Sequence, residues 1–198
     1  MTEIEDIVFR PVGVVRTKAS DDEIREGSRE LESFVEILPE FQEALDGLEG
    51  SSHILVLTYL NRLRLEQIGV LKVRPRRLLN RGFQLEELPL VGVFAIDSPS
   101  RPNPIGLSLV RLLRREGGRL VVLGLDCFNG TPVLDIKPYR DEYRLEDYTL
   151  AEWYRKLRTK AGRTSSLSTQ RKETFHMFPA CSQISSMVQR FPWRLWRR

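Results

Sequence analysis

The segment from Ser98 to Gly106 carries residue types that could hold a nucleotide on a rigid loop. Its three prolines, at positions 99, 102 and 104, each fix their own φ and restrict the preceding residue to extended backbone. Arg101 and Asn103 are therefore predicted to sit on a stiff loop. A guanidinium pairs with phosphate or carboxylate, and a carboxamide can both donate to and accept from a base edge. The alternative is a rigid connector between strands whose polar side chains face water.

A second segment, residues 126–139, places charged residues on a predicted strand. After the Asn129-Gly130 turn, strand alternation predicts Val133, Asp135 and Lys137 on one face, with Leu134 and Ile136 on the other. An aspartate and a lysine two positions apart are typical of a simple ion pair. They could equally anchor a site at the end of a sheet.

Two further features each have a structural and a functional interpretation. Four cations lie within the six residues 72–77, which could be a solvated face or a phosphate-contacting surface. His53 begins an apolar run and could be a structural histidine or a general base. With two histidines and two separated cysteines, a metal centre or a disulfide framework is not expected.

The elements that must position these residues are mostly strands. Short β-branched or aliphatic runs, separated by turn residues, continue from residue 8 to residue 138. Gly117-Gly118 and Asn129-Gly130 are predicted tight turns between strands. Helices are predicted after Pro39 and around Trp153. The predicted fold is mainly β: a single-sheet antiparallel or mixed β-barrel with one or two peripheral helices and a C-terminal extension. The predicted strands are residues 8–17, 31–38, 54–60, 70–73, 91–96, 107–113, 120–125 and 132–138.

Charge divides the chain into two predicted parts. Residues 163–198 hold seven of the 31 Lys/Arg residues but one of the 27 acidic residues, so the basic balance belongs mainly to this tail. We expect a folded domain over residues 1–162 and a poorly ordered tail over 163–198, which could alternatively contact RNA through its arginines and Trp193 and Trp196. The acidic N-terminus and the lack of a long apolar stretch predict a cytoplasmic protein without a membrane span.

Several segments, in order along the chain, form a recognisable set. They are residues 12–17, 48–54, 72–75 and 92–95, followed by Ser98-Pro99-Ser100-Arg101-Pro102-Asn103-Pro104-Ile105-Gly106 and then residues 129–139. Together they resemble the TsaA-like or TrmO family of S-adenosylmethionine-dependent tRNA N6-methyltransferases, which act on threonylcarbamoyladenosine next to the anticodon. The resemblance covers roughly residues 8–140.

The resemblance implies a homodimeric β-barrel that binds S-adenosylmethionine near the subunit interface and acts on tRNA. It implies catalytic or nucleotide-positioning roles for Asn103, Arg101 and Asp135, with Asp126 and His53 as further candidates for accepting a proton. It implies phosphate or substrate contacts from Arg74, Arg76, Arg77, Lys137 and Tyr139. The cofactor contacts that it implies are Arg25, Glu26, Asn61, Arg62, Asp97, Leu107, Asp126, Cys127, Phe128 and Asn129.

Three positions depart from the family's usual pattern. Asp97 stands where the family has arginine, Asn129 where it has aspartate, and Ser51 where it has phenylalanine. These departures favour an alternative function, in which the chain keeps the barrel and binds S-adenosylmethionine and RNA without methyl transfer. A third possibility is a methyltransferase for another small or RNA substrate.

Overall fold

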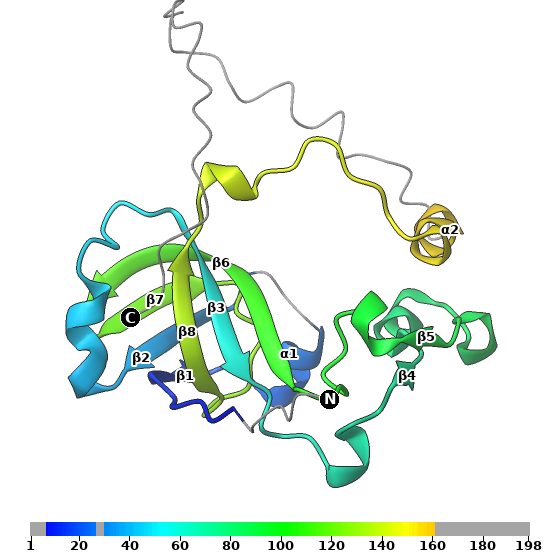
Figure 1. Cartoon of the computed structure of the whole chain (residues 1–198), viewed down its shortest axis with the longest axis horizontal. Coiled ribbons are helices and arrows are strands. Elements are labelled where there is room, and N and C mark those ends of the chain that lie inside the picture. The colour runs from blue at the N-terminus through cyan, green and yellow to red at the C-terminus, as the bar shows by residue number, and fades with distance from the viewer. Residues whose placement is uncertain (1–6, 27–29, 161–198) are drawn as a thin grey trace, which may run out of the picture. The chain divides into compact units, whose positions relative to one another are not determined.

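The computed structural model describes residues 7–26 and 30–160, and its central feature is a closed six-stranded antiparallel barrel (Figure 1). The predicted barrel is confirmed. Each strand pairs with two neighbours, so the sheet has no free edge. In order around the barrel the strands are β1 (Gly13–Thr17), β2 (Glu32–Ile37), β7 (Arg119–Leu123), β6 (Ile105–Glu116), β3 (His53–Tyr59) and β8 (Pro132–Pro138).

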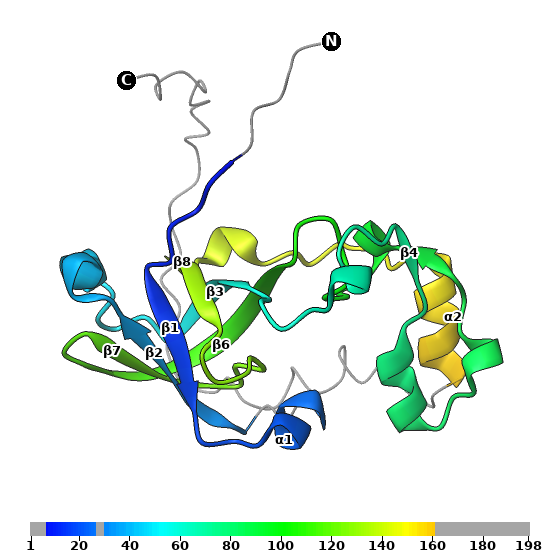
Figure 2. The ribbon, with the colours of Figure 1, turned by 90° about the horizontal axis from the view of Figure 1, so that it is seen from below.

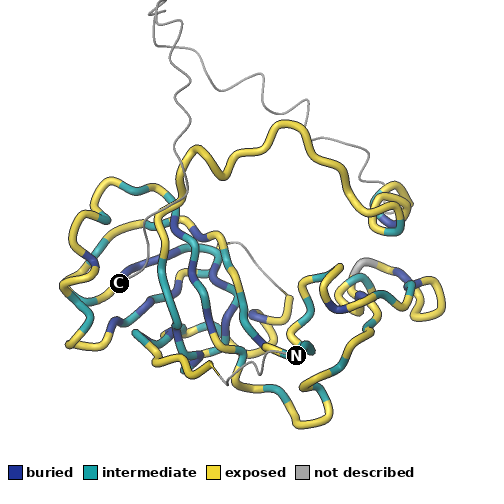
Figure 3. The backbone as a smooth tube through the Cα atoms, viewed as in Figure 1, coloured by how far each residue is buried: buried dark blue, intermediate teal, exposed yellow. Residues whose placement is uncertain are grey.

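Alternation along the strands fills the barrel with branched aliphatic side chains. β7 buries three consecutive residues, whereas on β1, β2 and β3 every second residue is buried or half-buried toward the core (Figure 3). Their partners across the ladder are buried as well, for example Val15 opposite Val35 and Ile54 opposite Val110. β-branched residues suit this pleated and enclosed surface. The core comprises Val15, Val35, Ile37, Leu45, Ile54, Val56, Val110, Leu120, Val122, Leu125, Cys127 and Val133.

The two ends of the barrel differ in chemistry. The end where β2 finishes is apolar and is covered by the 3₁₀ helix η1 (Pro39–Leu45), whose Leu45 joins the core. Arg115 fastens the loop after η1 through Asp46 at 3.0 Å and Glu49 at 2.7 Å. The other end carries the buried hydroxyls of Ser33, Thr58 and Thr131. We call this second end, where β1 finishes and β6 and β8 begin, the polar end.

Outside the barrel, the segment from Leu60 to Pro104 contains a separate two-stranded sheet. Two of the predicted strands are therefore not barrel strands: they form β4 (Lys72–Val73) and β5 (Val91–Gly92). Their residues pair only twice, because prolines and short 3₁₀ turns interrupt the runs on both sides. The 3₁₀ turns are η2 (Leu65–Gln67), η3 (Arg76–Arg81), η4 (Leu85–Glu87) and η5 (Val93–Ala95).

The helices match the sequence in part. The apolar spacing after Pro39 predicts a helix, and the structure forms the tighter 3₁₀ type there. Helix α2 (Glu152–Lys160) is found where Trp153 and Leu157 predict it. Helix α1 (Asp21–Glu26), directly after β1 in Figure 2, was not predicted because a six-residue segment with a single apolar side chain, Ile24, has no visible period. A last 3₁₀ turn, η6, spans Asp141–Tyr143.

Of the two predicted tight turns between strands, one is confirmed and the other does not form a hairpin. Gly117 has φ +60° and closes the β6–β7 hairpin as predicted. Gly130 also has positive φ, but the strands on either side of that turn pair with other strands, so no hairpin forms.

The chain divides into two compact units after Arg155. The predicted boundary at 162 and the predicted tail 163–198 lie outside the described residues. No helix within residues 7–26 and 30–160 has the length and apolarity needed to cross a membrane.

Candidate functional site

The polar end gathers most of the predicted site segments because of the strand order. The chain leaves the barrel here after β1, after β3 and after β7. These exits lead into α1, into residues 60–104 and into residues 124–131. Residues that are distant in sequence therefore meet at one end of the barrel.

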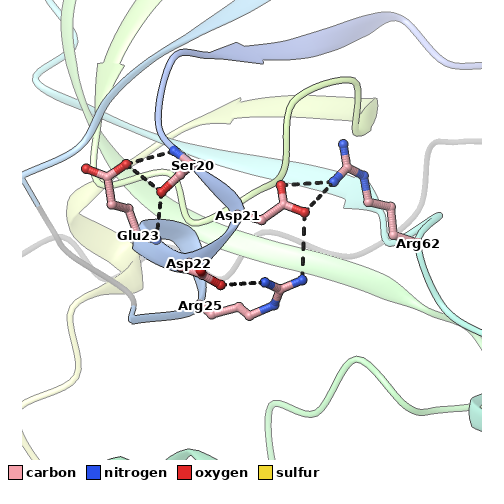
Figure 4. Close-up of polar contacts among 6 residues, drawn as sticks. All are labelled: Ser20, Asp21, Asp22, Glu23, Arg25 and Arg62. Carbon is pink, nitrogen blue, oxygen red and sulfur yellow. Dashed lines mark hydrogen bonds and ion pairs between the residues drawn. The ribbon is translucent and has the colours of Figure 1, made fainter.

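Asp21, Arg62 and Asn129 form the centre of this site, and Figure 4 shows Arg62 paired with Asp21. The Nη1 of Arg62 donates to both carboxylate oxygens of Asp21 at 3.0 Å, and its Nη2 donates to the backbone oxygen of Asn129 at 2.9 Å. The side-chain oxygen of Asn129 accepts from the backbone N–H of Thr17 at 3.2 Å. An amide oxygen accepts here as a carboxylate would, so the family's usual aspartate and this asparagine can serve the same contact.

Two guanidinium groups lie against the ring of Phe128. The Cζ of Arg62 is 4.9 Å from the ring centroid, and that of Arg25 is 5.4 Å away. Arg25 also pairs with Asp22 at 2.8 Å and with Asp21 at 3.7 Å. Four residues of the predicted cofactor set, Arg25, Arg62, Phe128 and Asn129, are thus in one cluster, and the structure adds Asp21 to them.

Helix α1 is held at its start by a reciprocal pair. Glu23 accepts from the backbone N–H of Ser20 at 2.8 Å, and Ser20 Oγ accepts from the backbone N–H of Glu23 at 3.3 Å. The backbone hydrogen bond from Ser20, followed by its hydroxyl, lowers the pKa of Glu23. The Ser-x-x-Glu spacing is a capping box, and this signal could have located the helix and Asp21 from the sequence.

Asp126 connects the polar end to the basic segment. It accepts from Arg77 Nη2 at 3.0 Å, and Ser108 Oγ lies 3.4 Å from its other oxygen. Arg76, the neighbour of Arg77, is exposed, while Arg74 donates to the backbone oxygen of Leu88. Arg74, one of the three arginines predicted to contact phosphate, therefore binds backbone within residues 60–104.

Cys127 is a buried thiol behind the same loop. Its Sγ lies 3.8 Å from Thr58 Oγ1. Burial raises the pKa of Cys127 to about 11, with the Thr58 contact opposing the shift. A thiol of such high pKa is a poor nucleophile at neutral pH, and Cys127 is a member of the hydrophobic core.

Arg101 holds the proline loop together. Its guanidinium donates to the backbone oxygens of Ser98 at 2.7 Å, Ile96 at 2.6 Å and Val93 at 3.3 Å. It is therefore engaged within the loop, where a direct contact to a nucleotide was predicted. Asn103 and Asp97 are exposed on this loop. Asn61, Glu26 and Leu107 are exposed as well.

Asp135, Lys137 and Tyr139 do not join the cluster. A bulge in β8 places Leu134 as an extra residue, so Val133 opposite Thr58 faces the core while Asp135 opposite Leu57 is on the outer face. The predicted shared face of Val133 and Asp135 is therefore wrong. Lys137 pairs with Asp135 at 2.7 Å, which raises the pKa of Lys137.

His53 and Tyr139 lie at the apolar end of the barrel. The backbone N–H of Tyr139 donates to the backbone oxygen of His53, and their rings are 6.5 Å apart. Nδ1 of His53 lies 3.0 Å from Ser52 Oγ. Both side chains are thus at the opposite end from Asp126.

The polar end combines hydrogen-bonding groups with an aromatic face, a combination that can bind a nucleoside. The carboxylate of Asp126 accepts hydrogen bonds, the hydroxyl of Ser108 can accept or donate, and Phe128 offers an aromatic face. Among the described residues, no group of three His, Cys, Asp or Glu side chains could hold a metal ion.

The closed antiparallel barrel differs from the doubly wound α/β sheet that binds dinucleotides. Residues 23–144 match the model of the tRNA-methyltransferase O N-terminal domain, and the chain belongs to this TrmO family. S-adenosyl-L-methionine is the cofactor of the family.

Individual relatives agree with this membership. A probable S-adenosyl-L-methionine-binding protein of Methanothermobacter thermautotrophicus is 44% identical over 72% of this chain and 96% of its own. A second such protein, of Pyrococcus abyssi, is 35% identical over 76% of this chain and 77% of its own. A putative S-adenosylmethionine-dependent methyltransferase of Pseudomonas aeruginosa is 50% identical over 53% of this chain and 43% of its own.

Solved structures are similar over a comparable region. A crystal structure titled TrmO has 34% identity and a TM-score of 0.57, covering 73% of this chain and 63% of that one. TrmO from Pseudomonas aeruginosa has 32% identity and the same TM-score, covering 74% and 62%. This chain therefore spans less than two thirds of the length of these solved relatives.

Proposed function

We propose that the protein is an S-adenosylmethionine-dependent tRNA methyltransferase that methylates N6 of threonylcarbamoyladenosine beside the anticodon. The observation that carries the proposal is the cluster of Asp21, Arg25, Arg62, Phe128 and Asn129 at the polar end of a TrmO-family barrel. When bound, S-adenosylmethionine supplies an activated methyl group. The task of the chain is then to align the nucleophilic nitrogen and to take its proton.

Asp126 is our candidate for the proton acceptor. Of the three candidates, Asp126 lies at the polar end, Asp135 is paired with Lys137 on the outer face, and His53 lies at the apolar end. Asp126 comes directly before the cofactor-binding candidates Cys127, Phe128 and Asn129. The exposed Asn103 is our candidate for reading the nucleotide base.

We also propose that two copies associate through the outer face of β3 and β6. Leu55, Leu57 and Tyr59 lie opposite Leu109, Leu107 and Ile105 on that face, and Leu107 and Leu109 are 66% and 52% exposed. Contiguous exposed apolar surface of this kind marks an interaction site. Light scattering should report a dimer that Leu109→Glu converts to a monomer, whereas Leu65→Glu, at an exposed leucine in η2, should leave it dimeric.

The decisive experiment is mass spectrometry of tRNA nucleosides from cells with and without this gene, repeated with the gene restored. Loss of the N6-methylated form of threonylcarbamoyladenosine, and its return with the intact gene, supports the proposal. An unchanged nucleoside profile contradicts it.

We propose a cytoplasmic location, where this tRNA is found. Fluorescence microscopy of a tagged chain tests that assignment.

The negative charge of Asp97 favours an alternative function, which is binding of S-adenosylmethionine and RNA without methyl transfer. The family has arginine at this exposed position, so the charge at position 97 is reversed in this chain. A binding protein for S-adenosylmethionine and RNA would keep the polar-end cluster and lack methyl transfer. Measured turnover of methylated tRNA by the purified protein separates the two functions.

A further inference from the structure

Asp21 is the residue on which both arginines of the polar end converge. It accepts from Arg62 through both carboxylate oxygens at 3.0 Å and lies 3.7 Å from Arg25 (Figure 4). Asp21 is not among the site residues that the family resemblance implies. Its side chain is about half exposed, so its interactions are partly screened by solvent.

Through Arg62, Asp21 is connected to the loop that follows β7. The same guanidinium that pairs with Asp21 donates to the backbone oxygen of Asn129 and lies over Phe128. Arg62 thus joins α1 to residues 128 and 129. If Asp21 no longer fixed it, the long arginine side chain would have several rotamers available and the loop would lose a hydrogen bond.

Charge gives Asp21 a second effect. Arg25 and Arg62 place two positive charges beside the Phe128 ring, and a sulfonium is itself a cation. Like charges repel, although solvent screens part of this repulsion because the Arg25 and Arg62 side chains are 60% and 44% exposed. The carboxylate of Asp21 offsets this positive charge at the point where the guanidiniums meet.

We propose that Asp21 is a positioning residue of the cofactor site: it fixes Arg62 against Phe128 and offsets the charge of Arg62 and Arg25 so that a cationic nucleoside is accepted. This inference rests on the proposed function, because it takes S-adenosylmethionine to bind at the polar end. Asp21 acts through the arginines and is not itself assigned a contact with the cofactor.

The test compares two ligands that differ at sulfur. S-adenosylmethionine carries a sulfonium, whereas S-adenosylhomocysteine has a neutral thioether. Calorimetry should show that Asp21→Asn weakens S-adenosylmethionine about tenfold and S-adenosylhomocysteine about threefold, in line with a charged hydrogen bond at a half-exposed site. Asp46→Asn is the matched control, since Asp46 also pairs with an arginine at 3.0 Å, Arg115, but lies near the apolar end of the barrel. It should change either affinity by less than about twofold.

A second variant tests whether Asp21 acts through Arg62. In an Arg62→Gln background, Asp21→Asn should cause little further loss of S-adenosylmethionine affinity, because the partner it fixes is already gone. The melting temperature of each variant is recorded so that affinity is compared between folded proteins.

The possible outcomes separate this inference from the proposed function. Equal losses for the two ligands, equal effects of Asp21→Asn and Asp46→Asn, or additive losses with Arg62→Gln each overturn the role of Asp21. If wild-type protein binds neither ligand at about 1 mM, the cofactor assignment itself fails, and the inference fails with it.

Discussion

Arg77 in η3 donates a hydrogen bond at 3.0 Å to Asp126, which lies between β7 and β8. The two residues are 49 positions apart, and each belongs to a different predicted function: Arg77 to RNA contact and Asp126 to the cofactor site. The pair links the basic segment to the polar end of the barrel. A phosphate that bound Arg77 would compete with Asp126 for the same guanidinium.

We expect Arg77→Ala to affect RNA binding more than folding. The side chains are 67% and 36% exposed, and an exposed ion pair contributes about 0–1 kcal/mol to stability. If Arg77 contacts one phosphate, its loss lowers the salt dependence of binding by about 0.7–0.9 in the slope of log K against log salt. Filter binding of tRNA at several salt concentrations measures this slope. Arg140→Ala, which removes an equally exposed arginine paired with Glu142, should leave it unchanged.

Gly106 should not tolerate a side chain. A Cβ built there would lie 2.5 Å from Thr58 Oγ1 and 3.0 Å from a methyl of Leu60. Overpacking of this kind costs about 1–3 kcal/mol. We expect Gly106→Ala to lower the free energy of unfolding by that amount in urea denaturation. Gly92→Ala is the control, because a Cβ there meets its nearest atom at 4.0 Å, and an equal loss in both variants would contradict the packing argument.

The sequence indicates the barrel well because its signal is local. Branched residues such as Val15 and Val56 alternate with outward residues, and Gly117 marks a hairpin that forms. The bulge at Leu134 leaves no such mark, since one inserted residue changes the face of Asp135 without changing residue composition.

The site was harder to predict for a different reason. Asp21, Arg62 and Asn129 meet because β1, β3 and β7 end at the same side of the barrel, which no local pattern encodes. Arg101 illustrates the reverse error. Its position between prolines indicates a rigid loop correctly, but spacing alone could not reveal that backbone oxygens of that loop occupy its guanidinium.

The buried thiol of Cys127 should make the free energy of unfolding depend on pH in the alkaline range. Because burial raises the pKa of this thiol from 9.0 to about 11, its neutral form is favoured in the folded state. The stabilisation is complete below pH 9 and is lost as the pH rises from 9 through about 11. In a Cys181→Ser background, wild-type Cys127 should therefore show a steeper fall in unfolding free energy across this range than Cys127→Ala. Parallel curves for the two proteins would show that the thiol is not responsible.

Asn103 and Asp97 together distinguish the enzyme from a binding protein. Both are exposed on the loop that Arg101 stabilises, and Pro102 and Pro104 restrict the backbone around Asn103, so substitution there should leave the fold intact. If the chain transfers methyl groups and Asn103 reads the base, Asn103→Ala should lower kcat/KM for tRNA at least about tenfold, which corresponds to about 1.4 kcal/mol of transition-state stabilisation. The affinity for S-adenosylmethionine should change little, because the polar-end cluster does not include Asn103.

Asp97→Arg restores the charge that the family carries at this position and should raise the rate if the negative charge weakens tRNA binding. Ser100→Ala, on the same loop, serves as the control for a nonspecific effect of substitution. Methyl transfer is followed with radiolabelled cofactor, and binding of cofactor and tRNA is measured on the same preparations. If wild type, Asn103→Ala and Asp97→Arg all bind both ligands yet show the same background rate, the chain is a binding protein and the enzymatic function is excluded.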